Sequence, residues 1–150
     1  MKLIDSHTHL YFAEDFPDQE AVVKRALDAG VEHMVLPGVN SSTIAPIKKL
    51  HAMFPEHTSM TIGLHPSDVA KDTFGEELAI IESELNVSSQ EYVAIGEIGI
   101  DLHWETHNID LQQQAFECQL NFAKEFKLPV VIHSRDAFEQ THEVLKGIYA

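Results

Sequence analysis

The spacing of apolar segments constrains the fold of this chain more than any other feature. Short runs rich in β-branched residues recur at intervals of roughly thirty residues, which is the length of a βαβ unit, and amphipathic segments lie between them. The runs cover residues 3–4, 34–36, 60–62, 93–95 and 130–132. The pattern predicts parallel strands with right-handed crossovers that place the helices on the outside.

Helices are predicted over residues 19–29, 43–53, 75–85, 111–126 and 137–148. Gly30 directly follows the first of them as a stop signal, and Pro129 separates the fourth from the strand that follows. With 150 residues, of which 44% are hydrophobic, the chain can bury a substantial core. We therefore expect one domain over residues 1–150.

The formal net charge of −14 at pH 7 would repel a polyanion unless bound metal or a local patch reverses its sign. It therefore counts against a broad nucleic-acid-binding surface. The negative charge is compatible with a metal site that binds one or two phosphates, because divalent ions are often the largest local charges in a site.

The first residues lack the apolar core of a signal peptide, and no apolar run approaches the length needed to span a bilayer. We expect a cytoplasmic protein that does not contact a membrane. The single cysteine, Cys118, cannot form an internal disulfide, and its apolar helical surroundings favour a small buried residue over a catalytic thiol.

His7 and His9 follow the first apolar run directly. Side chains two residues apart on a strand point to the same face, with Cα atoms about 6.6 Å apart. Two imidazoles placed in this way can converge on one cation. The His-x-His pattern is weak evidence alone and needs partners elsewhere in the chain.

Three further strand ends supply residues that titrate or bind metals: His65, Glu97 and His133. Ligands from separate strands can meet at one point if the sheet curls, and we expect a (β/α) barrel. Small residues flank Glu97, so backbone and metal could approach closely and the carboxylate could bridge two cations. Taken alone, His65 fits a hydrogen-bonded structural histidine better than a ligand.

The motifs at these strand ends resemble those of the TatD-type metal-dependent deoxyribonucleases of the amidohydrolase superfamily. The resemblance runs from Met1 to about Ala150 and extends to the helix before the last strand. It is carried by the segments 5–9, 63–66, 96–101 and 131–137. The fold that it implies is α/β, a TIM-like (β/α) barrel of which this chain holds about the first five βα units.

The resemblance implies a phosphodiesterase with two divalent metal ions, of zinc, manganese or magnesium. His7, His9 and Glu97 would bind one ion, and Glu97 and His133 the other. The implied reaction is hydrolysis of nucleic-acid phosphodiester bonds, with nucleotides trimmed from single-stranded DNA at its 3′ ends. Glu97 would be the catalytic residue.

The substrate contacts that we expect are His65, Arg135 and Trp104. Arg135 could contact a phosphate, although an ion pair with Asp136 is an equal alternative. Trp104 could stack on a base or only cover the end of the barrel. Asp5 could orient a metal-bound imidazole or cap a turn.

The length of the chain departs from the family pattern, because a complete (β/α)8 barrel takes about 250 residues. The resemblance implies that a further metal-ligating histidine and a late aspartate belong to strands beyond this sequence. Five strands alone would leave two open edges, so we expect self-association or poor stability. Catalysis by this chain alone should be weak or absent.

Two other functions stay open. A relative that hydrolyses amides or lactones would use a modified lysine as bridging ligand in many cases, whereas this chain has Glu97. A non-catalytic remnant that serves in binding or assembly fits the missing ligands.

Overall fold

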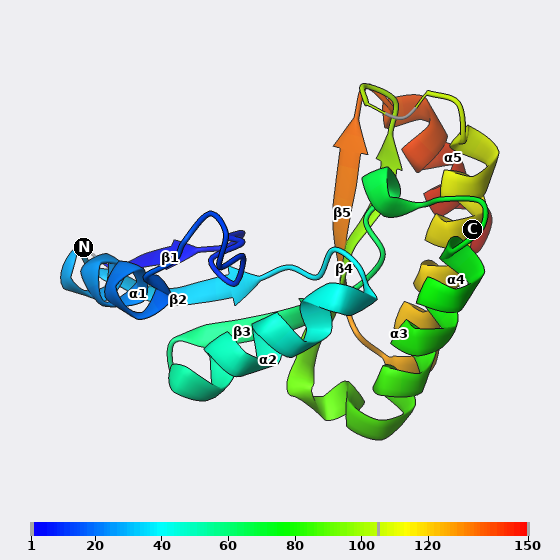
Figure 1. Cartoon of the computed structure of the whole chain (residues 1–150). Helices are drawn as coiled ribbons and strands as arrows, with labels where there is room; N and C mark the ends of the chain where they lie inside the picture. Colours follow the sequence, from blue (N-terminus) through cyan, green and yellow to red (C-terminus); the bar gives the residue numbers. More distant parts are fainter. Residues whose placement is uncertain (1, 105, 150) are drawn as a thin grey trace.

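The computed structural model describes residues 2–104 and 106–149, and five parallel strands in sequential order organise this part of the chain (Figure 1). Every neighbouring pair of strands is parallel, and each strand pairs with the next one along the chain. The strands are β1 (Leu3–Asp5), β2 (Val31–Leu36), β3 (Thr58–Ile62), β4 (Tyr92–Asp101) and β5 (Val130–Arg135). Sequential order is what a (β/α) barrel requires, and Figure 1 shows the sheet curling between the part with β1 and β2 and the part with β4 and β5. The predicted barrel-like α/β fold of about five units is confirmed.

A helix follows each strand, as predicted. The helices are α1 (Gln19–Asp28), α2 (Ile44–Met53), α3 (Phe74–Ser88), α4 (Ile109–Phe126) and α5 (Phe138–Tyr149). Gly30 has a φ of 95° after α1, which is the left-handed conformation expected of a glycine that ends a helix. Among the described residues, no helix combines the length and apolar character needed to cross a membrane.

The core is built from the apolar faces of the strands and of the helices that cover them. Its fully buried side chains come from β2, β3 and β4 on one side and from α1 to α4 on the other; they include Leu36, Ile62, Ile95, Val23, Leu50, Ile81 and Phe116. Figure 1 shows α4 and α5 on the same side of β4 and β5. This layering leaves the carboxyl ends of the strands free to build a site.

Two buried glutamines of α4, seven residues apart on one face, bind the backbone beside this edge of the sheet. The carboxamide of Gln119 accepts from Leu64 N at 2.6 Å and donates to Leu64 O at 3.1 Å. The carboxamide of Gln112 accepts from Asp101 N at 2.8 Å and donates to Asp101 O at 3.1 Å. Gln119 therefore holds the backbone one residue before His65, and Gln112 holds the backbone of Asp101 itself.

Strand β4 is much longer than the predicted segment 93–95, because glycine lets it continue close to β5. Gly99 has a φ of 147°, and a Cβ atom built there would lie 2.0 Å from the carbonyl oxygen of His133. Only glycine fits such a contact. The strand consequently carries both Glu97 and Asp101 alongside His133.

The two outermost strands each have one neighbour in the described part of the chain. All three residues of β1 are exposed. Ile4 is 70% exposed, and Phe138, just after β5, is 73% exposed. Ile4 thus marks the open edge at β1, whereas Phe138 is the first residue of α5, three residues after the end of β5.

Candidate metal centre

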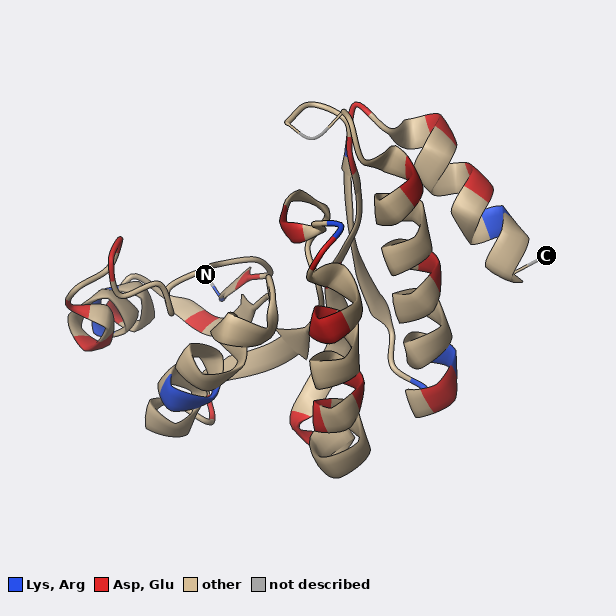
Figure 2. Cartoon of the chain, turned by 45° about the vertical axis from the view of Figure 1, so that its right-hand side comes forward, with Lys and Arg blue, Asp and Glu red and all other residues tan. Residues whose placement is uncertain are grey.

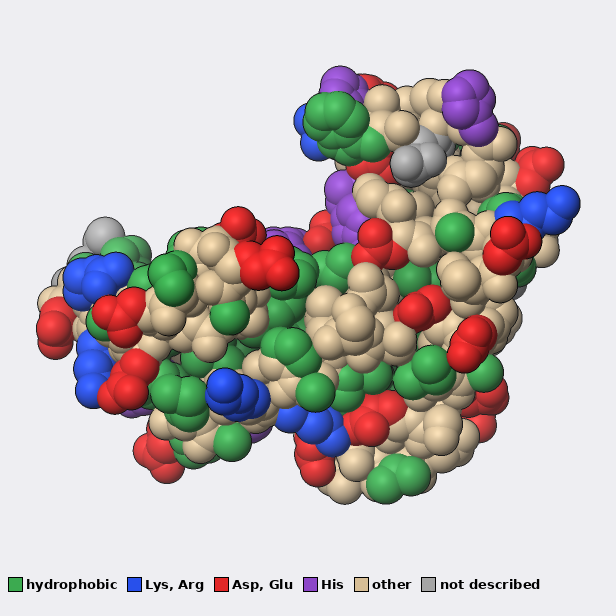
Figure 3. All heavy atoms as spheres, in the orientation of Figure 1, with side chains coloured by type: hydrophobic (Ala, Val, Ile, Leu, Met, Phe, Trp, Pro, Cys, Tyr) green, Lys and Arg blue, Asp and Glu red, His purple; other side chains and the backbone are tan. Residues whose placement is uncertain are grey.

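The predicted metal ligands meet at the carboxyl ends of the strands. His7 and His9 lie in the segment after β1, Glu97 lies in β4, and His133 lies in β5. His65 follows β3 and joins them. Figure 3 shows histidine side chains gathered at the notch between the two parts of the curled sheet.

The first group of possible ligands consists of His7, His9 and Glu97. Nε2 of His7 lies 3.2 Å from Nε2 of His9 and 3.1 Å from Oε2 of Glu97. Both histidines follow β1 rather than lying within it. The backbone N–H of Thr8 donates to Val35 O at 3.0 Å, which keeps this segment alongside β2.

The second group consists of His65, Glu97 and His133. Nδ1 of His133 lies 2.9 Å from Oε1 of Glu97 and 3.1 Å from Nε2 of His65. Glu97 thus turns one carboxylate oxygen toward each group. We expected His65 to contact substrate, and the structure places its ring nitrogen among the possible metal ligands.

A bulge in β4 directs Glu97 toward both groups. Ile95 pairs with Val130 and Ile98 pairs with Ile132, so β4 has one residue more than β5 between these pairs. The backbone N–H of Glu97 donates instead to Gly38 O at 2.9 Å, in the segment after β2. Glu97 therefore lies between the end of β2 and β5, where histidines of both groups can reach it.

Asp101 supports the second group; it belongs to the motif 96–101, but no role was assigned to it from the sequence. Its Oδ2 lies 2.9 Å from Nε2 of His133, while its Oδ1 accepts the backbone N–H groups of His103 and Trp104 at 2.9 and 2.8 Å. A signal was available, because residues four apart on a strand share a face and Asp101 lies four after Glu97. The same carboxylate thus holds a ligand and the adjacent loop.

Tyr11 supports the first group, and here the sequence offered no signal, because the segment after β1 follows no regular period. Its oxygen lies 2.8 Å from Nδ1 of His9, and its hydroxyl donates to Pro37 O at 2.5 Å. Burial and the nearby Glu97 raise the pKa of the Tyr11 hydroxyl. Asp5 accepts from the backbone N–H of His7 at 3.2 Å, so it caps the turn.

The electrostatics of the centre favour an anionic Glu97 and shift the pKa values of the surrounding imidazoles in different directions. Burial alone would raise the pKa of Glu97, but a hydrogen bond with His133 and the nearby His65 and His7 together bring it below its usual value. Burial lowers the pKa of His9 and of His65. Glu97, followed by Asp101, raises the pKa of His133.

The donor set fits divalent cations. Two imidazole nitrogens bound to one ion at roughly 2.0 to 2.1 Å lie about 2.9 to 3.5 Å apart, which matches the 3.2 Å between His7 and His9. Glu97 is only 8% exposed, and its ion-pair partners in the described part of the chain are all histidines. A buried carboxylate without lysine or arginine beside it leaves a charge that a cation would balance.

Arg135 and Trp104 lie together at the rim. The guanidinium carbon of Arg135 lies 5.4 Å from the ring centre of Trp104, and that ring is 67% exposed. Asp136 pairs with His103 at 3.1 Å. The rim thus offers a cation stacked on an exposed aromatic ring, next to the loop that Asp101 holds.

Comparisons with known proteins identify one family and several relatives to which this chain is similar. The model of the family described as TatD related DNase matches residues 4–149. An uncharacterized metal-dependent hydrolase, YabD of Bacillus subtilis, is 38% identical over 144 residues, which cover 96% of this chain and 55% of that protein. The 3′-5′ ssDNA/RNA exonuclease TatD of Salmonella typhimurium is 35% identical over 138 residues, covering 92% of this chain and 52% of that protein.

A solved structure shows the same fold. The crystal structure of YjjV, a TatD homolog from Escherichia coli K12, matches with a TM-score of 0.87 at 30% identity, covering 97% of this chain and 56% of that one. The chain spans about half the length of the relatives that it matches.

Proposed function

The chain belongs to the TatD-related DNase family of metal-dependent hydrolases, and we propose that it contributes the metal-binding part of a 3′-5′ exonuclease acting on single-stranded nucleic acid. The observation that carries this proposal is the position of Glu97. One buried carboxylate faces histidines from three other strand ends, with one oxygen toward each group. A shared carboxylate of this kind suits two cations close together, which is the arrangement that phosphodiester hydrolysis uses.

The residues have separate tasks in this proposal. His7, His9 and Glu97 hold one divalent ion of zinc, manganese or magnesium, and Glu97 holds the second with His133 and His65. When bound, the ions supply a water activated at neutral pH and neutralise charge on the phosphate oxygens. Asp101 keeps the ring of His133 oriented through its Nε2.

Arg135 and Trp104 are the proposed substrate contacts. The guanidinium can pair with a phosphate, and the exposed indole can stack on a base whatever its identity. Figure 2 shows acidic residues spread over the outer helices and few basic ones. This charge distribution favours contact with the end of a single strand over contact along a duplex, because a long polyanion would be repelled.

A nuclease assay tests the proposal. A single-stranded oligodeoxynucleotide labelled at its 5′ end is incubated with the protein and manganese, magnesium or zinc, and the products are resolved by length. Because catalysis by this chain alone should be weak, we expect slow metal-dependent shortening in single-nucleotide steps, which a phosphorothioate linkage at the 3′ end blocks and which Glu97→Gln abolishes. A protein that binds no metal, or a Glu97→Gln variant as active as the parent, would contradict it.

The exposed sheet edges favour a second function, a metal-binding assembly module. Ile4 exposes apolar surface in β1 and Phe138 does so at the start of α5, three residues after β5, and the open edges of these outermost strands can pair readily with other chains. Self-association through these edges would bury both side chains. Light scattering measures it: Ile4→Lys and Phe138→Lys should shift an oligomer toward monomer, and metal uptake without turnover would favour this function over the exonuclease.

A further inference from the structure

The hydroxyl group of Tyr11 is committed to one hydrogen bond as a donor. A tyrosine hydroxyl carries a single proton, and the carbonyl oxygen of Pro37 at 2.5 Å has no proton to give. The proton of Tyr11 therefore lies between these two oxygens. Only the lone pairs of the Tyr11 oxygen remain for its other neighbour, Nδ1 of His9 at 2.8 Å.

This fixes which nitrogen of His9 carries the proton. A neutral imidazole has one N–H group, and the contact with Tyr11 is a hydrogen bond only if His9 donates from Nδ1. Its Nε2 then has a free lone pair, and this atom faces Nε2 of His7. We propose that Tyr11 is a positioning residue that holds His9 in the Nδ1–H tautomer, with Nε2 ready to bind a cation.

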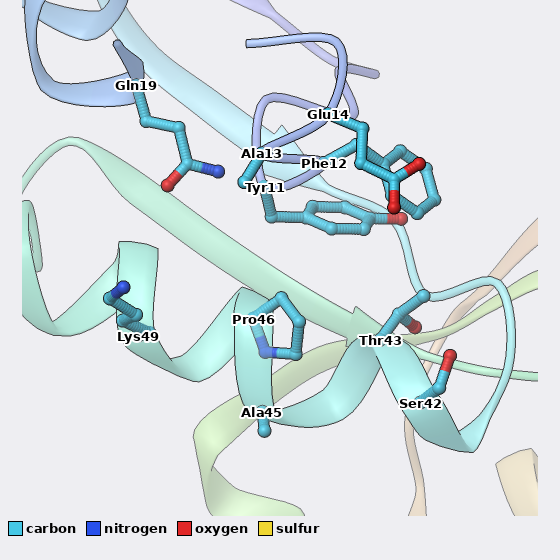
Figure 4. Close-up of a pocket in the computed structure, with 10 residues that line it drawn as sticks. All are labelled: Tyr11, Phe12, Ala13, Glu14, Gln19, Ser42, Thr43, Ala45, Pro46 and Lys49. Atoms are coloured by element: carbon cyan, nitrogen blue, oxygen red, sulfur yellow. The ribbon is translucent and has the colours of Figure 1, made fainter. Parts of the chain in front are cut away.

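The packing around Tyr11 holds the hydroxyl in place. The residue is 2% exposed, and its ring centre lies 4.6 Å from that of Phe12. Figure 4 shows the ring of Tyr11 between the 12–14 segment and the start of α2, where Thr43 and Pro46 lie. These residues all line a cavity of about 580 Å³. The ring cannot turn away from His9 without disturbing these contacts.

His7 differs from His9 in which ring nitrogen carries the proton. Its Nε2 lies within hydrogen-bond distance of both Oε2 of Glu97 and Nε2 of His9, which both act as acceptors in the arrangement above. A neutral His7 in the metal-free protein therefore carries its proton on Nε2 and shares it between these two acceptors. A cation requires that lone pair, so His7 changes tautomer on binding while His9 does not.

The inference rests on the proposed metal site for its purpose, but its first test needs no metal. Long-range ¹H–¹⁵N spectra of the metal-free protein distinguish the two tautomers, and loss of one signal set in His9→Gln assigns His9. We expect the Nδ1–H form for His9 in the parent. The Nε2–H form would overturn the inference whether or not the protein binds metal.

The second test compares Tyr11→Phe with Tyr92→Phe. Tyr92 is a matched control because it is also buried and its hydroxyl donates to Glu84 at 3.0 Å. It lies at the first residue of β4, at the other end of that strand from Asp101. Loss of a partner that orients a ligand lowers metal affinity about 10- to 100-fold. Calorimetry with zinc or manganese should show this loss for one ion in Tyr11→Phe and for neither ion in Tyr92→Phe.

The outcomes separate the two proposals. A parent protein that takes up no metal overturns the proposed function, while the spectrum of His9 still decides the tautomer. Unchanged affinity and an unchanged His9 spectrum in Tyr11→Phe overturn the role of Tyr11. Should Tyr11→Phe fold poorly, the spectrum of the parent protein alone decides between the Nδ1–H and Nε2–H forms of His9.

Discussion

Replacing Gln119 by methionine isolates the contribution of one side chain to the shape of the site. Methionine has nearly the same length and volume as glutamine but cannot form its hydrogen bonds. Gln119 is fully buried, and its carboxamide bonds both backbone groups of Leu64, a residue that is itself 1% exposed. The substitution leaves the N–H and C=O groups of Leu64 without these partners, one residue before His65.

The expected cost follows from those two backbone groups. A buried polar group that loses its partner costs about 1 to 3 kcal/mol, so two cost about 2 to 6 kcal/mol. The thioether recovers part of this, about 1 kcal/mol, because it replaces a polar end by an apolar one. We expect Gln119→Met to lower the free energy of unfolding by about 1 to 5 kcal/mol, and the upper end of this range is a large share of the stability of a typical domain.

Chemical denaturation followed by circular dichroism measures this loss, with Gln114→Met as the control. Gln114 lies on the same helix but is exposed, so its substitution should change the free energy of unfolding by no more than about 0.5 kcal/mol. The reasoning is refuted if Gln119→Met costs less than about 1 kcal/mol, the lower bound for a single unpaired group, with an unchanged denaturant slope. That result would mean that Leu64 finds other partners and that Gln119 does not hold the end of β3.

Three further predictions concern the site. Zinc or manganese at a hundred times its dissociation constant should stabilise the protein by about 2.7 kcal/mol for each ion bound, a rise of about 5 to 10 °C in melting temperature per ion, and a chelator should reverse it. Glu97→Gln should remove this rise, since both groups lose the carboxylate; a full rise in that variant would place the ions elsewhere. Gly99→Ala should prevent native folding, because its Cβ would meet the carbonyl oxygen of His133 at 2.0 Å; a cooperative melt at the parent temperature would contradict the close pairing of β4 and β5. Trp104→Ala should leave the melting temperature within about 1 to 2 °C of the parent, from about 0.5 kcal/mol for an exposed residue, yet weaken binding of single-stranded DNA by about 1 to 3 kcal/mol in a fluorescence titration.

Local patterns in the sequence were sufficient to predict the order of elements and the strand ends that build the site. Periodicity and glycine signals depend on neighbours in the chain, and His7, His9, Glu97 and His133 do converge. The length of β4 could not be predicted in this way. Its continuation to Asp101 depends on the close approach of β5 and on the bulge at Glu97. The backbone N–H of Glu97 donates to Gly38 O, which is far away in the sequence.

Side-chain direction was also beyond the sequence patterns. The position of His65 after a strand was evident, but whether it faces a ligand group or a substrate depends on the curl of the sheet. Tyr11 reaches His9 through an irregular segment that no period describes. Contacts of this kind are set by tertiary packing, which local patterns do not encode.

The division of Glu97 between two groups has a thermodynamic consequence. Its two oxygens belong to one rigid carboxylate, so an ion held through Oε2 fixes the orientation that Oε1 presents to a second ion. Occupancy of the two positions would then be linked, and the factor by which the first ion alters the affinity for the second must equal the factor in the reverse direction. A titration of such a centre would depart from two independent binding curves, toward a sigmoid if shared ordering outweighs repulsion between the cations and toward two widely separated steps if repulsion dominates.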